Sequence, residues 1–272
     1  MLASNELVTV IITTFHRTDY LKTCISSIIK QTCTNLEIIV VSDGKDINSE
    51  RIVKQFGDSR ISYYELHHSG LPAVGRNFGI SVANGYYVAF CDDDDCWMPT
   101  KVEEQVSRIN TSSCDIIYCY AILINGEGEM IRNTQGALYR ILRVIERHLT
   151  RFKIYIYTKS YITFSSIMIK RSIAKDCYFD EDTKLRGSED YYFILRAIHS
   201  CNLCSLEKEL VCYRLHNSNI SNSKRDGYKR SLRVLHTLRN EKKIKKIFYY
   251  TGTLIYQLKL LFTILKSKRN DI

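Results

Sequence analysis

The sequence predicts an α/β fold with a mostly parallel central sheet covered by helices on both faces. Over the first hundred of its 272 residues, runs rich in β-branched and aromatic residues alternate with runs of helical spacing. The strand-type runs are apolar at almost every position, as is typical of strands buried on both faces of a parallel sheet. We therefore expect one large sheet with helical crossovers.

Eight elements are expected in order over the first 110 residues. The expected strands are 7–15, 36–44, 61–66 and 86–91, and the expected helices are 19–31, 49–56, 71–85 and 99–110. The first helix carries Leu21, Ile25 and Ile28 at helical spacing. Pro99 suits a first helical turn, and Gly85 suits a helix end.

The pattern becomes mixed beyond residue 112. Strands are expected at 114–124, 161–170 and 205–216, and helices at 138–149 and 188–200. The last helix begins with a capping Ser188 and an acidic first turn. We expect this half to extend the same sheet. The predicted domains are 1–222, with halves 1–100 and 101–222, and a basic helical tail over 223–272.

Composition indicates a globular protein in a reducing compartment. Hydrophobic residues make up 45% and charged residues 25% of the chain. Cysteines such as Cys91, Cys119 and Cys212 lie inside apolar runs, so we expect free thiols. The Cys201-x-x-Cys204 pair has zinc-ligand spacing, but no second pair matches it. Residues 1–6 lack a basic region before an apolar stretch, so no secretory signal is expected.

Polar side chains follow three of the expected strands. They are Thr13–Thr14, Asp43 and the run Asp92–Asp95. Ligands of open α/β sheets bind at the carboxyl ends of the strands. The sequence therefore predicts a polar rim at that edge.

The run of four aspartates needs an explanation. Each pair of neighbouring carboxylates costs about 2–3 kcal/mol at an effective dielectric near 20. A divalent cation offsets that cost, because Mg²⁺ and Mn²⁺ prefer oxygen ligands and complete their shells with substrate phosphates and water. Strand alternation would point Asp92 and Asp94 one way and Asp93 and Asp95 the other. The alternative is a solvated acidic loop.

At these residues the chain resembles the bacterial family 2 glycosyltransferases of the GT-A fold. The resemblance covers roughly residues 7–222 and is carried by five blocks in order: VTVIITTFHR, LEIIVVSDG, GLPAVGRNFGI, GYYVAFCDDDDCWMP and GSEDYYFILRA. It implies a Rossmann-like nucleotide-binding half, a mixed acceptor half, a nucleotide-diphosphate sugar donor such as a UDP-sugar, and Mn²⁺ or Mg²⁺. It also implies inversion at the anomeric carbon.

The resemblance implies three groups of site residues. Those at the nucleotide sugar are Thr14, Asp43, Arg76, Asp92 and Asp93; those at the metal are Asp94, Asp95 and His216; the catalytic base is Asp190, with Glu189 beside it. Asp94 is favoured as metal ligand, although four consecutive aspartates leave the register open by one residue. The chain departs from the family at Thr13, where proline is usual, and at His16, where asparagine is usual.

Each of these residues also has an ordinary structural interpretation. Asp43 could be a turn residue before Gly44, and Arg76 a surface cation. Glu189 and Asp190 could simply favour the positive end of a helix dipole. His216 alone carries little weight, and Trp97 fits packing under the acidic loop better than flanking a sugar.

The C-terminal tail differs from the rest of the chain in its basic charge. The net charge of the chain is +10, but residues 224–272 hold 14 Lys and Arg against 3 Asp and Glu, a net of +11. Its apolar part, 247–265, is interrupted by Gln257 and Lys259, which argues against a membrane span. We expect an amphipathic helix on the cytoplasmic membrane surface, or helices packed on the main domain, and no nucleic-acid partner.

The resemblance also implies a saccharide acceptor, linked to polyprenyl diphosphate, in O-antigen or capsule synthesis. Two other functions remain open. A sugar-phosphate nucleotidylyltransferase would need a glycine-rich loop after the first strand, and TTFHRTDYL has no glycine. The other is a non-catalytic protein that binds sugar nucleotides or membrane surfaces.

Overall fold

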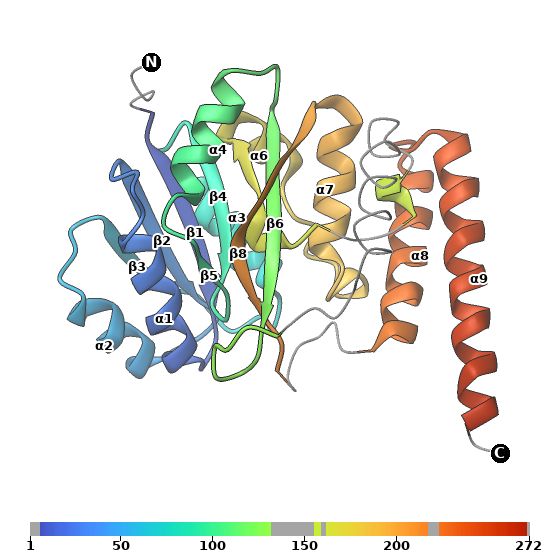
Figure 1. Cartoon of the computed structure of the whole chain (residues 1–272), viewed down its shortest axis with the longest axis horizontal. Coiled ribbons are helices and arrows are strands. Elements are labelled where there is room, and N and C mark those ends of the chain that lie inside the picture. Colours follow the sequence, from blue (N-terminus) through green and yellow to red (C-terminus); the bar gives the residue numbers. More distant parts are fainter. Residues whose placement is uncertain (1–5, 132–154, 159–161, 217–222, 271–272) are drawn as a thin grey trace. The chain divides into compact units, whose positions relative to one another are not determined.

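The computed structural model describes residues 6–131, 155–158, 162–216 and 223–270 (Figure 1). These residues form two compact units. Unit 1 contains the described residues of 1–131, 162–181 and 200–215, and unit 2 contains those of 132–161, 182–199 and 216–272. The predicted domain boundaries at residues 100 and 222 stay predictions.

Unit 1 is built on one mixed sheet. Its strands are β1 (Val8–Thr14), β2 (Leu36–Ser42), β3 (Ile61–Glu65), β4 (Tyr87–Asp92), β5 (Cys96–Trp97), β6 (Ile116–Ile124), β7 (Met168–Lys170) and β8 (Leu203–Arg214). Their order is β3-β2-β1-β4-β7-β6-β8-β5. The first four strands in this order are parallel, β7 is antiparallel to β4 and β6, and β6 and β8 are parallel. The predicted α/β class and the extension of one sheet by the second half are confirmed.

The helices of unit 1 follow the predicted alternation. They are α1 (Thr18–Ile29), α2 (Ile47–Gln55), α3 (Pro72–Val82), α4 (Lys101–Asn110) and α6 (Arg171–Cys177). The strand predicted over 161–170 is wrong for its first part, where Phe164–Ser166 form a 3₁₀ turn, η2. The Ser166 hydroxyl donates to the Thr163 carbonyl at 2.6 Å, and such local hydrogen bonds favour turns over strands. The helix predicted over 138–149 lies outside the described residues.

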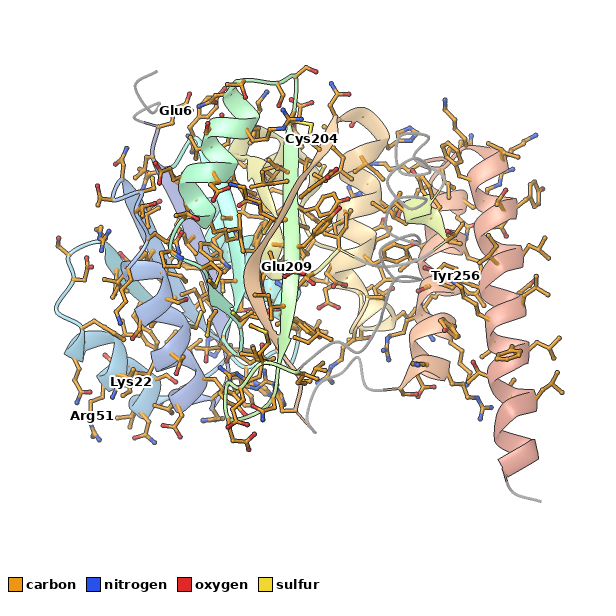
Figure 2. All side chains as sticks on the ribbon, in the orientation of Figure 1. Glu6, Lys22, Arg51, Cys204, Glu209 and Tyr256 are labelled. Atoms are coloured by element: carbon orange, nitrogen blue, oxygen red, sulfur yellow. A yellow bond between two sulfur atoms is a disulfide. The ribbon has the colours of Figure 1, made fainter. Side chains whose placement is uncertain are left out.

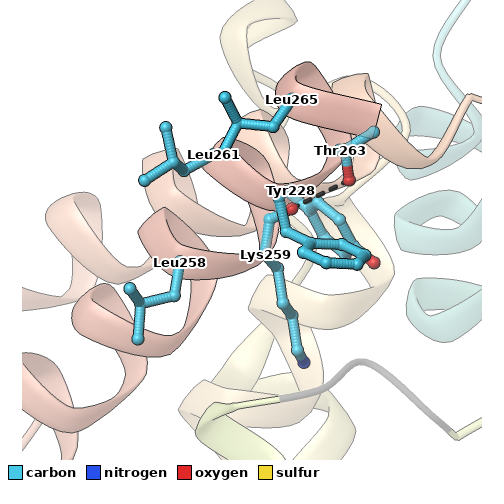
Figure 3. A pocket seen from close by; sticks show the side chains of 7 residues that line it. Tyr228, Leu258, Lys259, Leu261, Thr263 and Leu265 are labelled. Carbon is cyan, nitrogen blue, oxygen red and sulfur yellow. Dashed lines mark hydrogen bonds between the residues drawn. The ribbon is translucent and has the colours of Figure 1, made fainter. Parts of the chain in front are cut away.

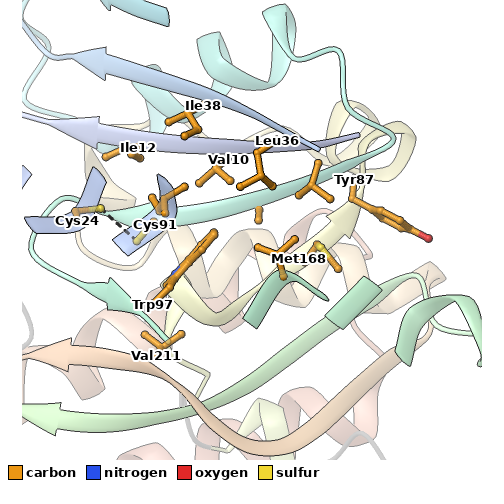
Figure 4. Packing of buried hydrophobic residues seen from close by; sticks show 14 of the residues in the cluster. Val10, Ile12, Cys24, Leu36, Ile38, Tyr87, Cys91, Trp97, Met168 and Val211 are labelled. Atoms are coloured by element: carbon orange, nitrogen blue, oxygen red, sulfur yellow. Dashed lines mark hydrogen bonds between the residues drawn. The ribbon is translucent and has the colours of Figure 1, made fainter. Parts of the chain in front are cut away.

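The core of unit 1 lies between the sheet and its helices (Figure 4). Val10 and Ile12 of β1 are completely buried, as are Leu21 and Ile25 of α1. Trp97 is 4% exposed, and its indole N–H donates to the Ser165 carbonyl at 2.9 Å. The prediction that Trp97 packs beneath the acidic loop is therefore confirmed.

Helix α3 lies unusually close to β1. A Cβ on Gly79 would be 2.6 Å from Ile11 Cγ2, and one on Gly75 would be 2.9 Å from Thr13 Cγ2. Real Cβ atoms do not approach other atoms this closely, so only glycine allows the contact. The close approach holds Arg76, which lies between these glycines in sequence, at the carboxyl edge of the sheet.

Unit 1 contains a disulfide between Cys114 and Cys204, whose Cα atoms are 5.8 Å apart (Cys204 is labelled in Figure 2). The expectation of free thiols is therefore wrong for this pair, because the fold brings together two cysteines that are 90 residues apart in sequence. Cys91, Cys119 and Cys212 are free, as expected. Since Cys204 is bonded to Cys114, the Cys201–Cys204 spacing does not mark a zinc site.

Replacing Cys114 by serine is expected to lower the free energy of unfolding by about 2–4 kcal/mol under oxidising conditions, because a bridge over a long loop restricts the unfolded chain. Urea unfolding with and without reductant measures the effect. Cys201→Ser, which removes a free thiol, is the control and should match the native chain. A native chain whose stability is indifferent to reductant would show that the pair is not bonded in solution.

Unit 2 is mainly helical. Its elements are the 3₁₀ turns η1 (Tyr155–Tyr157) and η3 (Thr183–Leu185), and the helices α7 (Glu189–Ser200), α8 (Lys224–Asn240) and α9 (Lys246–Asn270). Helices α8 and α9 lie side by side (Figure 1). The Tyr256 hydroxyl of α9 donates to the Tyr191 hydroxyl of α7 at 3.3 Å, so α9 packs on α7. None of the described helices is both long enough and apolar enough to cross a bilayer.

Candidate functional site

The three predicted strand ends meet at one edge of the sheet in unit 1. Thr14 of β1 is in register with Ser42, the residue before Asp43, and Thr13 is in register with Asp92 of β4. The predicted rim is therefore present, and it brings the aspartate run beside Thr14.

The chain turns immediately after Asp92. The Asp95 amide donates to the Asp92 carbonyl at 3.1 Å, closing a turn over Asp93 and Asp94. The predicted alternation of the four carboxylates is therefore wrong, because an extended backbone ends at Asp92. Aspartate is common in such turns.

Asp92 is paired with Arg76. The guanidinium Nη2 donates to Asp92 Oδ1 at 2.8 Å, and the guanidinium carbon Cζ lies 4.3 Å from the centre of the Phe164 ring. Arg76 is only 6% exposed. The alternative of a surface cation is excluded, and the partly buried ion pair fixes the end of β4.

Asp93 and Asp94 share one cation, the guanidinium of Arg17. Its Nη1 atom lies 3.2 Å from Asp93 Oδ1 and 2.8 Å from Asp94 Oδ2. Asp93 also accepts a hydrogen bond from the Thr14 hydroxyl at 2.8 Å. Burial, and then the charge of Asp94, raise the pKa of Asp93 to about 7. The sequence did not lead us to single out Arg17. It follows Thr14 by three residues, so its backbone lies near the same edge of the sheet.

Asp95 is enclosed completely, with 0% exposure. Its Oδ2 accepts from the Ser165 hydroxyl at 2.5 Å and its Oδ1 from the Arg214 amide at 3.0 Å. Burial raises the pKa of Asp95 well above its usual range. Both oxygens are used to hold the loop, which favours the more exposed Asp94 as a metal ligand; the metal role predicted for Asp95 stays a prediction.

Arg214 supports the same loop from β8. Its Nε donates to the Asp94 carbonyl at 2.9 Å, and its Nη1 donates to the Gly126 carbonyl at 2.8 Å. Arg214 is 4% exposed. Neither Arg214 nor Ser165 was singled out from the sequence, because no local motif marks them.

Asp43 organises the loop before α3. Its carboxylate accepts from the Ser69 amide at 2.7 Å and from the Gly70 amide at 2.8 Å. The neighbouring His68 ring stacks on Phe15, with centroids 4.4 Å apart. Phe15 is 41% exposed and thus presents an aromatic face beside Asp43.

His16 has a positive φ of 53°. Asparagine adopts this left-handed conformation more readily than most residues. This conformation gives a physical reason for the asparagine that the family usually has here. The His16 amide also donates to Asp46 at 3.2 Å, which ties the turn to the start of α2.

The remaining predicted residues belong to unit 2. Glu189 and Asp190 form the first turn of α7, and Asp190 Oδ1 accepts from the Tyr191 amide at 2.6 Å. The Ser188 hydroxyl donates to the Leu185 carbonyl. His216 is partly exposed, just beyond β8. The predicted roles of these residues stay predictions.

The residues at the rim fit a metal that takes few protein ligands. Within the ranges that the structure describes, no three or more His, Cys, Asp or Glu side chains form a metal cage. Mg²⁺ and Mn²⁺ often bind through one or two carboxylates and substrate phosphates. The Asp94 side chain is 12% exposed and offers carboxylate oxygens of this kind.

Curated proteins similar to this chain include glycosyltransferases. The chain is 28% identical over 267 residues to an uncharacterized glycosyltransferase of Methanocaldococcus jannaschii, covering 93% of this chain and 86% of that one. It is 27% identical over 257 residues to the UDP-Glc:alpha-D-GlcNAc-diphosphoundecaprenol beta-1,3-glucosyltransferase WfgD of Escherichia coli, covering 93% and 94%.

Solved structures show the same fold. TarS of S. aureus in complex with UDP-GlcNAc superposes with a TM-score of 0.68 at 20% identity, covering 92% of this chain and 71% of that one. The mannosyltransferase PcManGT of Pyrobaculum calidifontis, in complex with GDP-Man and Mn²⁺, gives 0.67 at 14% identity, covering 92% and 70%. These similarities confirm the predicted GT-A fold. A model of the family described as "Glycosyl transferase family 2" matches residues 9–177, and the chain therefore belongs to that family.

Proposed function

We propose that the protein transfers a sugar from a nucleotide-diphosphate sugar to a hydroxyl of a saccharide acceptor, with inversion and with Mn²⁺ or Mg²⁺ as cofactor. The observation that carries this proposal is the acidic rim of unit 1. There Asp92, Asp93 and Asp94 are held in a defined arrangement by two arginines and a threonine. A solvated acidic loop would not be buried and paired in this way.

Each proposed role follows from chemistry that the side chain can perform. The cation, when bound at Asp94, supplies positive charge to the departing diphosphate. Thr14, Asp43, Arg76, Asp92 and Asp93 bind and orient the donor, with His216 near the diphosphate. Asp190 takes the proton of the attacking hydroxyl, with Glu189 beside it, and general-base help of this kind contributes about 10²–10⁴-fold.

The aromatic pair of Phe15 and His68 extends the donor site. These rings lie beside Asp43 at the rim, and Phe15 is exposed. Stacking of a base on an aromatic face is worth about 1–3 kcal/mol and tolerates different bases. We propose that the nucleobase stacks here while Asp43 and the loop that it holds fix the edge of the base.

The names of the relatives support a choice of substrates. The E. coli relative is named for UDP-glucose and for an acceptor on diphosphoundecaprenol, and TarS binds UDP and UDP-GlcNAc. We therefore propose a UDP-sugar donor and a lipid-linked saccharide acceptor, in O-antigen or capsule synthesis. Such an acceptor places the protein on the cytoplasmic face of the cell membrane, with no role for nucleic acid.

The test is a screen of UDP- and GDP-sugars against polyprenyl-diphosphate-linked monosaccharides, with and without Mn²⁺. We expect release of the nucleoside diphosphate only when donor, acceptor and Mn²⁺ are all present, and an inverted anomeric proton in the product by NMR. Formation of a nucleotide sugar from a nucleoside triphosphate and a sugar phosphate would identify a nucleotidylyltransferase. Sugar-nucleotide binding without transfer to any acceptor would identify a binding protein.

A further inference from the structure

One side of α9 exposes an almost continuous apolar surface. Over residues 246–265, nine side chains are exposed, and only Lys246 and Gln257 among them are polar. The other seven are 53–70% exposed and follow each other at intervals of one, three or four residues: Ile247, Tyr250, Leu254, Leu258, Leu261, Phe262 and Leu265. We call these seven residues the α9 face. Residues at such intervals share one side of a helix, here about 27 Å long at 1.5 Å per residue.

The opposite side of α9 is already covered within unit 2. A Cβ on Gly252 would lie 2.5 Å from the Tyr157 carbonyl oxygen and 2.9 Å from Leu235 Cδ1, so α9 is in close contact with η1 and α8. Phe248 stacks on Tyr157, with centroids 4.9 Å apart. The helix is therefore apolar on two sides, and only one of them has a partner among the described residues.

Lys259 does not interrupt the α9 face. Its Nζ donates to the Thr158 carbonyl at 2.7 Å and lies 5.2 Å from the centre of the Tyr256 ring, which is itself buried. The lysine that breaks the apolar run in the sequence is thus directed into unit 2. The exposed side carries no charge between Ile247 and Leu265.

A groove opens beside this face (Figure 3). It has a volume of about 480 Å³ and is lined by Tyr228 of α8 and by Leu258, Lys259, Leu261, Phe262, Thr263 and Leu265 of α9. Four of these seven residues are leucine or phenylalanine, and all four belong to the α9 face. The groove suits a hydrocarbon chain better than a polar ligand.

Cations stand at both ends of the α9 face in the sequence. Lys242, Lys243, Lys245 and Lys246 precede it, and Lys266, Lys268 and Arg269 follow it. Apolar side chains between basic groups are typical of helices that lie in the interface of an anionic membrane. The same charge opposes pairing with a second copy, because each copy carries a net of +11 over residues 224–272.

We propose that α9 docks in the plane of an anionic bilayer through the α9 face, with one lipid chain entering the groove beside Tyr228. This inference deepens the proposed function, since it names the surface through which the protein reaches a lipid-linked acceptor. The helix lies on the membrane and does not cross it, because its other side is held by α8 and η1.

Vesicle flotation of the full chain tests the docking. Binding to phosphatidylcholine vesicles containing phosphatidylglycerol should exceed binding to phosphatidylcholine alone, and the double variant L254Q/L261Q should lose about tenfold or more of it. The matched control is Gln257→Asn, an exposed polar position between the two leucines, which should bind as the native chain does. Circular dichroism checks that each variant is folded.

Three results would overturn this inference. They are unchanged vesicle binding by L254Q/L261Q, equal binding to neutral and anionic vesicles, and a dimer in solution that the double variant dissociates. A phospholipid with a photoreactive acyl chain should label residues 258–265, and labelling confined to other residues would refute the groove. Transfer to a water-soluble acceptor analogue should persist in the double variant, so failure of docking is distinct from failure of the transferase proposal.

A second, independent observation concerns Arg17. A single nitrogen, Nη1, contacts both Asp93 and Asp94, and the Arg17 side chain is 34% exposed, at the mouth of the cluster. Asp92 is paired with Arg76, and Asp95 is enclosed by Ser165 and Arg214. Arg17 is therefore the cation that the two carboxylates between these anchored ends share.

We infer that Arg17 is a resident counter-ion that competes with the divalent cation for Asp94. A cation within coordination distance of Asp94 would lie a few ångströms from the guanidinium, and like charges at that distance repel strongly. Arg17 must then move away. A bound nucleoside diphosphate offers it a new anionic partner, so cation and nucleotide should bind cooperatively. This inference rests on the metal in the proposed function.

Electron paramagnetic resonance of free Mn²⁺ tests this role without any measurement of activity. In the absence of nucleotide, Arg17→Met should bind Mn²⁺ about tenfold more tightly than the native chain. When UDP is added, the Mn²⁺ affinities of the variant and the native chain should become more similar. Arg51→Met, which removes an exposed cation from α2, is the control and should leave Mn²⁺ affinity unchanged (Arg51 is labelled in Figure 2). Equal or weaker binding by Arg17→Met would overturn the inference, whereas no Mn²⁺ binding by any variant would refute the proposed metal itself.

Discussion

Asp94→Asn is expected to lower kcat/KM for sugar transfer by about 10²–10³-fold, because in the proposed function the Asp94 carboxylate would hold the cation that supplies positive charge to the diphosphate. Asp94 combines a carboxylate that Arg17 contacts at 2.8 Å with a backbone carbonyl that accepts a hydrogen bond from Arg214. The amide keeps the shape of the side chain but binds a hard cation poorly. Mn²⁺-dependent binding of UDP should weaken in parallel.

The measurement is a progress curve of UDP release at saturating Mn²⁺, together with calorimetric titration of UDP in the presence and absence of Mn²⁺. Asp19→Asn is the matched control, since it removes an exposed carboxylate from α1 and should leave both quantities unchanged. Native transfer by Asp94→Asn would remove this residue from the metal site. Equal loss of UDP binding with and without Mn²⁺ would indicate damage to the nucleotide site instead.

Asp190→Asn is expected to lower kcat by about 10²–10⁴-fold while leaving the dissociation constant of the UDP-sugar within about twofold, because a general base acts on the acceptor and not on the donor. The position of Asp190 in the first turn of α7 also serves the helix dipole. That second contribution is worth only about 0.3–1 kcal/mol of stability. The two effects are therefore separable.

Comparison of Asp190→Asn with Glu189→Gln separates the loss of proton transfer from the loss of helix-dipole stabilisation. Both variants remove one negative charge from the same helical turn, so each should lose the helix-dipole contribution of about 0.3–1 kcal/mol. A much larger loss of kcat in Asp190→Asn then measures proton transfer. Partial recovery in Asp190→Glu, which restores a carboxylate at a different reach, would support the assignment, and full activity in Asp190→Asn would refute it.

The first half of the fold could be predicted because its signals are local. Strands β1, β2 and β4 are apolar runs, and the helices between the strands have clear spacing and ends. The rim followed from the same reasoning, since parallel strands that alternate with helices place their carboxyl ends together. The segment 161–170 was harder to predict, because the hydrogen bond from the Ser166 hydroxyl to the Thr163 carbonyl favours a turn over a strand.

The contacts that hold the aspartate run in place could not be predicted in the same way. Arg76 and Asp92 were recognised from their motifs, but their pairing depends on the close packing of α3 on β1. Ser165 comes from η2, which packs against β4, and Arg214 comes from β8, which pairs with β5 immediately after the aspartate run. The inward direction of Lys259 and the bond between Cys114 and Cys204 likewise depend on contacts between residues far apart in the chain.

The hydrogen bonds that hold Asp95 also have a consequence for biosynthesis. Their partners, Ser165 and Arg214, follow it by 70 and 119 residues. On the ribosome, the first four strands can emerge long before the segments that brace the acidic turn. The acidic turn is therefore completed late in translation. A prematurely terminated polypeptide that lacks β8 would carry all four aspartates without the Arg214 contacts that hold Asp94 and Asp95 in place.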